Sequence, residues 1–140
     1  MFSLFQQKPK ERKYVGFDDI KYALDNTKEF ILINTITAKD QEILIKMTIC
    51  ADEEEEFVND LIVENTDREP VIIVYGMNSA DDTVEKKYKQ LVSLGFSRVF
   101  IYSGGLFEWV LLQELYGENE FPTTGKVKDF LKYRVKPYFQ

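Results

Sequence analysis

Residues 71–76 read Val-Ile-Ile-Val-Tyr-Gly, and residues 99–105 read Val-Phe-Ile-Tyr-Ser-Gly-Gly. Each stretch is a short apolar run without polar alternation that ends in a loop of small residues. Such runs are typical of strands that are covered on both faces, as in a parallel sheet. The segment between the two runs carries apolar residues at helical spacing, which predicts a helix connecting two parallel strands.

Outward from these runs, strand and helix patterns alternate along the chain. Residues 29–34 repeat the continuous apolar pattern, and residues 42–49 alternate apolar and more polar side chains, which predicts another strand. We also expect a short strand over 14–15 and an amphipathic segment over 126–133. Helices are expected over 17–24, 52–65 and 106–116, and from near Asp82 to Gly95. This alternation predicts one α/β domain with a mostly parallel sheet of four or five strands flanked by helices.

Composition excludes several classes of protein and chemistry. The chain has 140 residues, of which 44% are hydrophobic, so it can bury a core and is not intrinsically disordered. It contains no histidine, which excludes His-ligated zinc and catalytic triads that use histidine. Cys50 is the single cysteine, so we expect no internal disulfide and a reducing, cytoplasmic location. No apolar run approaches membrane-spanning length, and residues 1–13 do not resemble a secretory signal.

Charge is distributed unevenly between the ends and the middle. The formal net charge is −6, yet the segments 1–13 and 126–140 are both rich in lysine and arginine. The middle of the chain is therefore strongly acidic, which argues against a nucleic-acid partner. The basic ends are either simply solvated, or they contact the acidic body or an acidic neighbour.

Ligands in parallel α/β sheets bind beyond the carboxyl ends of the strands, which here selects the loops 76–82 and 103–105. The order of residues around these loops is distinctive: Gly95-Phe96 leads into the strand at Val99, Gly104-Gly105 follows that strand, and Trp109 comes four residues later. This pattern resembles the second half of a rhodanese-like domain, the fold shared by single-domain sulfurtransferases and Cdc25-type phosphatases.

The resemblance implies a three-layer rhodanese-like domain over 14–117. Residues 1–13 would form a basic N-terminal extension, and residues 118–140 a C-terminal extension with a short helix. Gly95, Gly104 and Gly105 would be scaffold glycines, with the last two allowing a close approach to the neighbouring loop. An anion held by the 103–105 turn is the alternative.

In active relatives, a cysteine directly follows the strand that corresponds to residues 71–75, and the next loop wraps backbone N–H groups around an anion. Here that position is Gly76, and the loop contains no thiol. Asp81 and Asp82 stand where an arginine is expected, and Asn34-Thr35 replaces the aspartate of the family's second strand. The resemblance thus implies a degenerate active-site loop with no catalytic residue, cofactor or metal, made of Gly76, Met77, Asn78, Ser79, Ala80, Asp81 and Asp82.

Other chemistry-bearing residues have plainer interpretations. Cys50 precedes the acidic run 52–56, whose negative field disfavours a thiolate, so we interpret it as a small side chain without a catalytic role. The acidic run and the Asp81-Asp82 pair are interpreted as helix starts. The alternatives are a divalent cation for the pair, and calcium or a basic partner for the acidic run. Trp109 is expected in the core.

Two functional hypotheses follow from the resemblance and from the missing thiol in the loop. The first is a catalytically inactive rhodanese-like module used in protein binding, self-association or assembly. The alternative is an active sulfurtransferase or phosphatase that uses Cys50. The chain is also similar to rhodanese-like proteins of large DNA viruses, which implies a place in a larger assembly such as a virus particle. The C-terminal segment is unusually apolar, so it is expected to pack on the body or on a partner, with these candidate partner-binding residues: Phe130, Tyr133, Tyr138 and Phe139.

Overall fold

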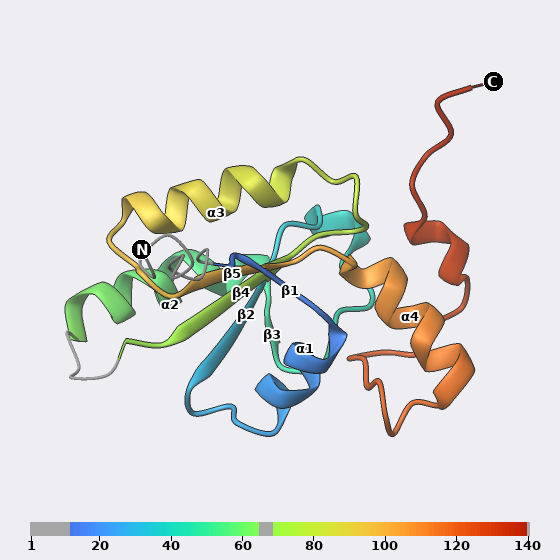
Figure 1. Ribbon diagram of the computed structural model, residues 1–140, viewed down its shortest axis with the longest axis horizontal. Coiled ribbons are helices and arrows are strands. Elements are labelled where there is room, and N and C mark those ends of the chain that lie inside the picture. Colours follow the sequence, from blue (N-terminus) through green and yellow to red (C-terminus); the bar gives the residue numbers. More distant parts are fainter. Residues whose placement is uncertain (1–11, 65–68, 140) are drawn as a thin grey trace, which may run out of the picture.

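The computed structural model describes residues 12–64 and 69–139, so most of the basic N-terminal extension (1–13) lies outside the described part (Figure 1). The elements follow one another as β1 (Tyr14–Val15), α1 (Phe17–Leu24), β2 (Phe30–Asn34), η2 (Ala38–Asp40), β3 (Thr48–Ile49), α2 (Ala51–Glu64), β4 (Val71–Tyr75), α3 (Thr83–Ser93), β5 (Val99–Tyr102), α4 (Gly105–Tyr116) and η3 (Phe130–Tyr133).

The five strands form one sheet in the order β1-β5-β4-β2-β3, and all neighbouring strands are parallel. β4 is the central strand, and all five of its residues are buried. Its register places Asn34 beside Tyr75 on one side and Tyr102 beside Tyr75 on the other. The predicted α/β domain with a parallel sheet is therefore confirmed.

Helices cover both faces of the sheet and make three layers. α1 and α4 pack on one face, where Ile20, Leu106 and Trp109 join a single core cluster. α2 and α3 pack on the other face, where Val58 and Leu91 belong to a second cluster (Figure 1). Because side chains alternate along β4, it supplies both clusters, which explains why its sequence is apolar throughout. Trp109 is fully buried, as expected.

The strand predicted over residues 42–49 is wrong for most of its length. The sheet takes in only Thr48–Ile49. Ile43, Leu44 and Ile45 are consecutive and all buried, a pattern that no half-covered strand can produce. They pair instead with the loop before the C-terminal segment, through an antiparallel bridge between Ile45 and Thr123.

The C-terminal segment packs on the body, one of the two expected placements, and within the amphipathic segment predicted over 126–133 only a short helix forms. Its helical part is the 3₁₀ turn η3, which covers four residues. Phe121 and Tyr133 are 3% and 2% exposed and belong to the same cluster as α1 and α4. Within the described residues, no helix is long and apolar enough to cross a membrane.

Candidate functional site: the loop after the central strand

The loop 76–82 leaves the carboxyl end of β4 and leads into α3, and the carboxylate of Asp81 lies inside it. Asp81 Oδ2 accepts a hydrogen bond of 3.0 Å from the Met77 N–H. Asp81 Oδ1 accepts one of 3.1 Å from the Thr83 N–H and one of 2.5 Å from the Thr83 hydroxyl. The loop thus directs backbone N–H groups at an anion, but this anion is one of its own side chains.

Gly76 occupies the position where the resemblance places a nucleophile, and its surroundings leave no room for a side chain. A Cβ atom at this residue would stand 2.5 Å from Asp81 Oδ2 and 2.6 Å from Cγ2 of Val84. Glycine is therefore the residue that lets the Asp81 carboxylate and α3 approach the end of β4.

The start of α4 fastens the loop from the side of β5. The N–H groups of Leu106 and Phe107 donate to the carbonyls of Gly76 and Met77, each at 2.9 Å. Gly105 has a φ of +68°, and a Cβ there would lie 2.9 Å from the Gly76 carbonyl oxygen. The expectation that these glycines allow close approach between two loops is confirmed at Gly105.

Asn78 connects the loop to the C-terminal segment. Its side-chain amide donates to the carbonyls of Tyr133, at 3.0 Å, and Arg134, at 3.2 Å. Its side-chain oxygen accepts from the N–H of Ala80 at 3.0 Å. The end of η3 therefore lies over the loop, a contact between residues far apart in sequence that no local pattern could have indicated.

The two loop aspartates differ in role. Asp82 is the N-cap residue of α3 by position, but its side chain makes no capping hydrogen bond. The capping hydrogen bond expected at the helix start is therefore absent at Asp82, and Asp81, one residue before it, accepts from the N–H of Thr83 at the first position of α3.

A small hollow of about 130 Å³ lies beside the loop, on its β5 side. Asp81 and Glu85 both line it, together with Tyr14 and Ser103. Hydrogen bonds from the Tyr14 hydroxyl, at 2.6 Å, and from Lys13, at 3.0 Å, lower the pKa of Glu85 below its usual value, so this carboxylate is ionised at neutral pH. Two carboxylates make the hollow unfavourable for thiosulfate or phosphate.

Cys50 is exposed and directly follows β3, the edge strand of the sheet. β2 lies between β3 and β4, so about 10 Å of sheet separates the Cys50 backbone from the end of β4. The acidic run after it opens α2, as predicted. Among the side chains that the structure describes, no group of three or more His, Cys, Asp and Glu is arranged to hold a metal ion.

The candidate partner-binding residues separate into two kinds. Tyr133 is buried, which raises the pKa of its hydroxyl, and Phe130 packs against the core. Tyr138 and Phe139 are 90% and 89% exposed.

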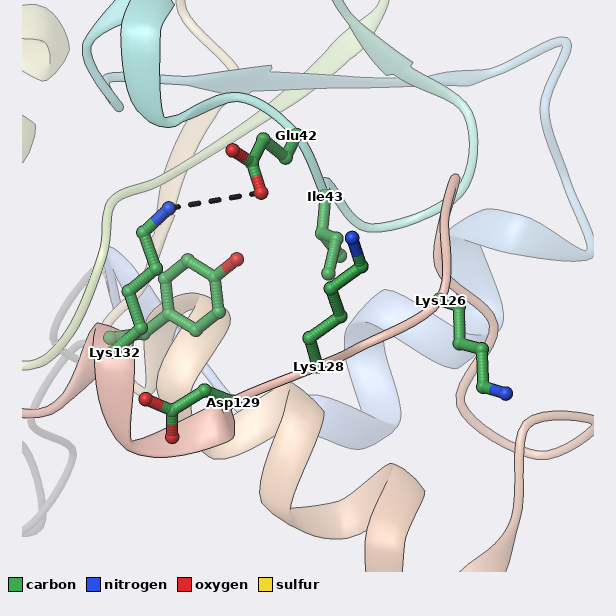
Figure 2. A pocket seen from close by; sticks show the side chains of 7 residues that line it. Glu42, Ile43, Lys126, Lys128, Asp129 and Lys132 are labelled. Atoms are coloured by element: carbon green, nitrogen blue, oxygen red, sulfur yellow. Dashed lines mark ion pairs between the residues drawn. The ribbon is translucent and has the colours of Figure 1, made fainter.

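A pocket of about 330 Å³ lies between the C-terminal segment and the loop around residue 42. Figure 2 shows Lys132 extending across it toward Glu42, with 3.9 Å between the ammonium nitrogen and the carboxylate, while Lys126 points away. Lys132 also lies 3.8 Å from Asp40. Lys132 of the C-terminal segment therefore pairs with Glu42 across the pocket and with Asp40 beside it.

The comparisons with known proteins bear on the fold. No protein-family model matches the chain, and no curated protein matches it by sequence. Solved structures do match. Yeast Ygr203w, described as a protein tyrosine phosphatase of the rhodanese family, aligns over 86% of this chain and 96% of its own, with a TM-score of 0.60 and 16% identity.

Two further structures agree. The yeast single-domain sulfurtransferase RDL2 aligns over 79% of this chain and 98% of its own, with a TM-score of 0.51 and 17% identity. A full-length protein from Lactobacillus plantarum aligns over 81% and 88%, with a TM-score of 0.56 and 18% identity. The chain therefore has the rhodanese-like fold.

Proposed function

We propose that this chain is a catalytically inactive rhodanese-like module that acts by binding protein, as a partner or accessory subunit. The observation that carries the proposal is the Asp81 carboxylate, which accepts the loop's N–H groups at the place where an active loop would hold its anion. Gly76, at the nucleophile position, supports it.

Charge explains why this arrangement opposes transfer chemistry. A sulfur or phosphoryl donor is an anion, and a thiolate nucleophile also needs positive potential around it. A second negative charge brought within 4 Å of the Asp81 carboxylate would meet a repulsion of about 4 kcal/mol at the effective dielectric near a protein surface. The donors at Met77 and Thr83 already bind a carboxylate and cannot offset that cost.

The environment of the protein is part of the same proposal. An exposed free thiol at Cys50 supports a reducing, cytoplasmic compartment. The acidic middle of the chain supports a protein partner over nucleic acid. A place in an assembly such as a virus particle rests on the family resemblance.

Activity assays test the proposal directly. The protein is incubated with thiosulfate and cyanide, and separately with p-nitrophenyl phosphate, beside Cys50→Ser. We expect no thiocyanate or phosphate release above the buffer background from either protein. Release that disappears in Cys50→Ser would overturn the proposal in favour of an enzyme that uses Cys50. Release that persists in Cys50→Ser would overturn it as well, since the chain then has another nucleophile.

A further inference from the structure

A groove with both polar and apolar lining runs between α2 and α3, the two helices that cover the second face of the sheet. Two adjoining hollows of about 530 and 320 Å³ share Leu94. Val58 and Leu91 form the floor and are 7% and 2% exposed, whereas Ile62 and Leu94 on the walls are each 46% exposed. The groove thus presents apolar side chains to solvent in a concave surface.

The rim of this groove is acidic. Glu54 and Glu55 line it from the first half of α2, and Glu69 lines it beyond the end of that helix. Lys87 of α3 pairs with Glu54 at 3.0 Å, which neutralises one of these charges. An occupant that fits an apolar floor and an acidic rim is a short segment with both apolar and basic side chains.

The chain carries such a segment at its own C-terminal end. Beyond the buried Tyr133, residues 134–139 include Arg134 and Lys136, followed by Tyr138 and Phe139, which are 90% and 89% exposed. Figure 1 shows this tail leaving the body beyond η3. The rings of Tyr138 and Phe139 contact each other edge to face at 5.0 Å, so they form one apolar unit.

We propose that the α2–α3 groove binds residues 134–139 of a second copy of this chain. The inference deepens the proposed function, on which it rests, by naming the protein that is bound. The tail starts from η3, which packs on the sheet face opposite α2 and α3, and it lies toward the other end of the molecule's long axis from α2 (Figure 1). Six residues span about 20 Å at most, which favours the groove of a neighbouring copy over the chain's own.

The surface area that a tail buries in a groove indicates how the two copies are arranged. Two aromatic side chains bury roughly 300–500 Å² together, and a groove contributes a similar area. One tail in one groove then buries roughly 600–1,000 Å², which is small for a stable complex, whereas a reciprocal exchange of both tails reaches the range of standard interfaces. A two-fold symmetric dimer with two tail–groove contacts is therefore the expected form.

Sedimentation equilibrium of the 140-residue chain tests this arrangement with variants of the tail and of the groove. On the tail, Tyr138→Ser/Phe139→Ser is compared with Leu115→Ser, which removes a 74% exposed side chain elsewhere. On the groove, Ile62→Lys is compared with Val63→Lys. The Val63 side chain is next in sequence to Ile62, is 80% exposed and does not line the groove. We expect a dimer whose dissociation constant rises at least about tenfold in the tail and Ile62 variants and stays within about twofold in both controls.

The outcomes separate this inference from the proposed function. A monomer at every concentration would overturn the exchange, and so would a dimer that tolerates both the tail and Ile62 variants. A photo-crosslinker at residue 138 should become joined to peptides of α2 or α3 in the gel band of the dimer. The same crosslink in the band of the monomer would mean that the tail folds onto its own chain, which would overturn the exchange. None of these results depends on the transfer assays, so an inactive monomer would leave the proposed function standing while removing this inference.

Discussion

At the scale of single residues, Asp81 and Gly76 act as a pair at the end of β4. The carboxylate binds the N–H groups of Met77 and Thr83, and the missing side chain at Gly76 makes the space for it. Hydrogen bonds to a charged acceptor each contribute about 1.5–3 kcal/mol, so the carboxylate helps to hold the loop in its compact form. An external anion could reach these N–H groups only if the hydrogen bonds to Asp81 were broken first, which costs free energy.

This pairing predicts the response to Gly76→Ala. The added Cβ would collide with Asp81 Oδ2 and Val84, so we expect the free energy of unfolding to fall by about 2 kcal/mol in urea denaturation. Gly16→Ala is the matched control, because a Cβ there meets nothing within 4 Å, and it should cost less than about 1 kcal/mol at this N-cap. Equal losses in both variants would mean that the loop has room for a side chain.

At the scale of elements, the edge strand β1 shows how side chains fasten a strand of only two residues. It pairs with β5, and the Ile101 N–H donates to the Lys13 carbonyl at 2.7 Å. The side chains of Lys13 and Tyr14 both bind Glu85 of α3, and the Lys13 ammonium lies 4.8 Å from the Tyr88 ring centre. These contacts tie the strand to the helix that crosses above it.

The contacts of Glu85 predict a pH dependence of this edge. Because the Tyr14 and Lys13 hydrogen bonds lower its pKa in the folded state, their contribution is complete above the ordinary value of 4.5 and is lost as pH falls through the lowered pKa. Amide hydrogen exchange, corrected for intrinsic rates, should show Ile101 losing protection as the pH falls below 4.5, while Ile73 in β4 keeps its protection. In Glu85→Gln the Ile101 amide should already have lost protection at neutral pH. If its protection in Glu85→Gln equalled that of the unaltered protein at neutral and at acidic pH, Glu85 would not hold β1 in place.

At the scale of the whole molecule, the residues after α4 complete the core. Phe121 contacts Trp109, with 5.0 Å between ring centres, and the Trp109 indole N–H donates to the Pro122 carbonyl at 3.0 Å. Tyr133 then closes the same cluster from η3. The C-terminal segment up to Tyr133 therefore shares one core with α1 and α4.

We therefore expect substitutions of Tyr133 and Tyr138, which are five residues apart, to differ strongly in their effect on the free energy of unfolding. Tyr133→Ala removes a side chain that is 2% exposed and should lower the free energy of unfolding by about 3 kcal/mol or more. Tyr138→Ala removes one that is 90% exposed and should change it by less than about 0.5 kcal/mol in dilute protein. The fluorescence of Trp109, the single tryptophan, reports both transitions. Similar stability of the two variants would show that η3 is not part of the core.

The sequence by itself determined the parallel α/β architecture, because strands buried on both faces must be apolar throughout, as in Val71–Tyr75 and Phe30–Asn34. It also showed that no thiol follows β4. Only the tertiary structure decided that the Asp81 carboxylate fills the loop, since an aspartate before a helix reads as a cap whichever N–H groups it accepts. The same holds for residues 43–45, whose consecutive burial depends on residues 122–124, nearly eighty positions away. Local patterns record what a segment buries, and the packing of distant segments decides what it is buried against.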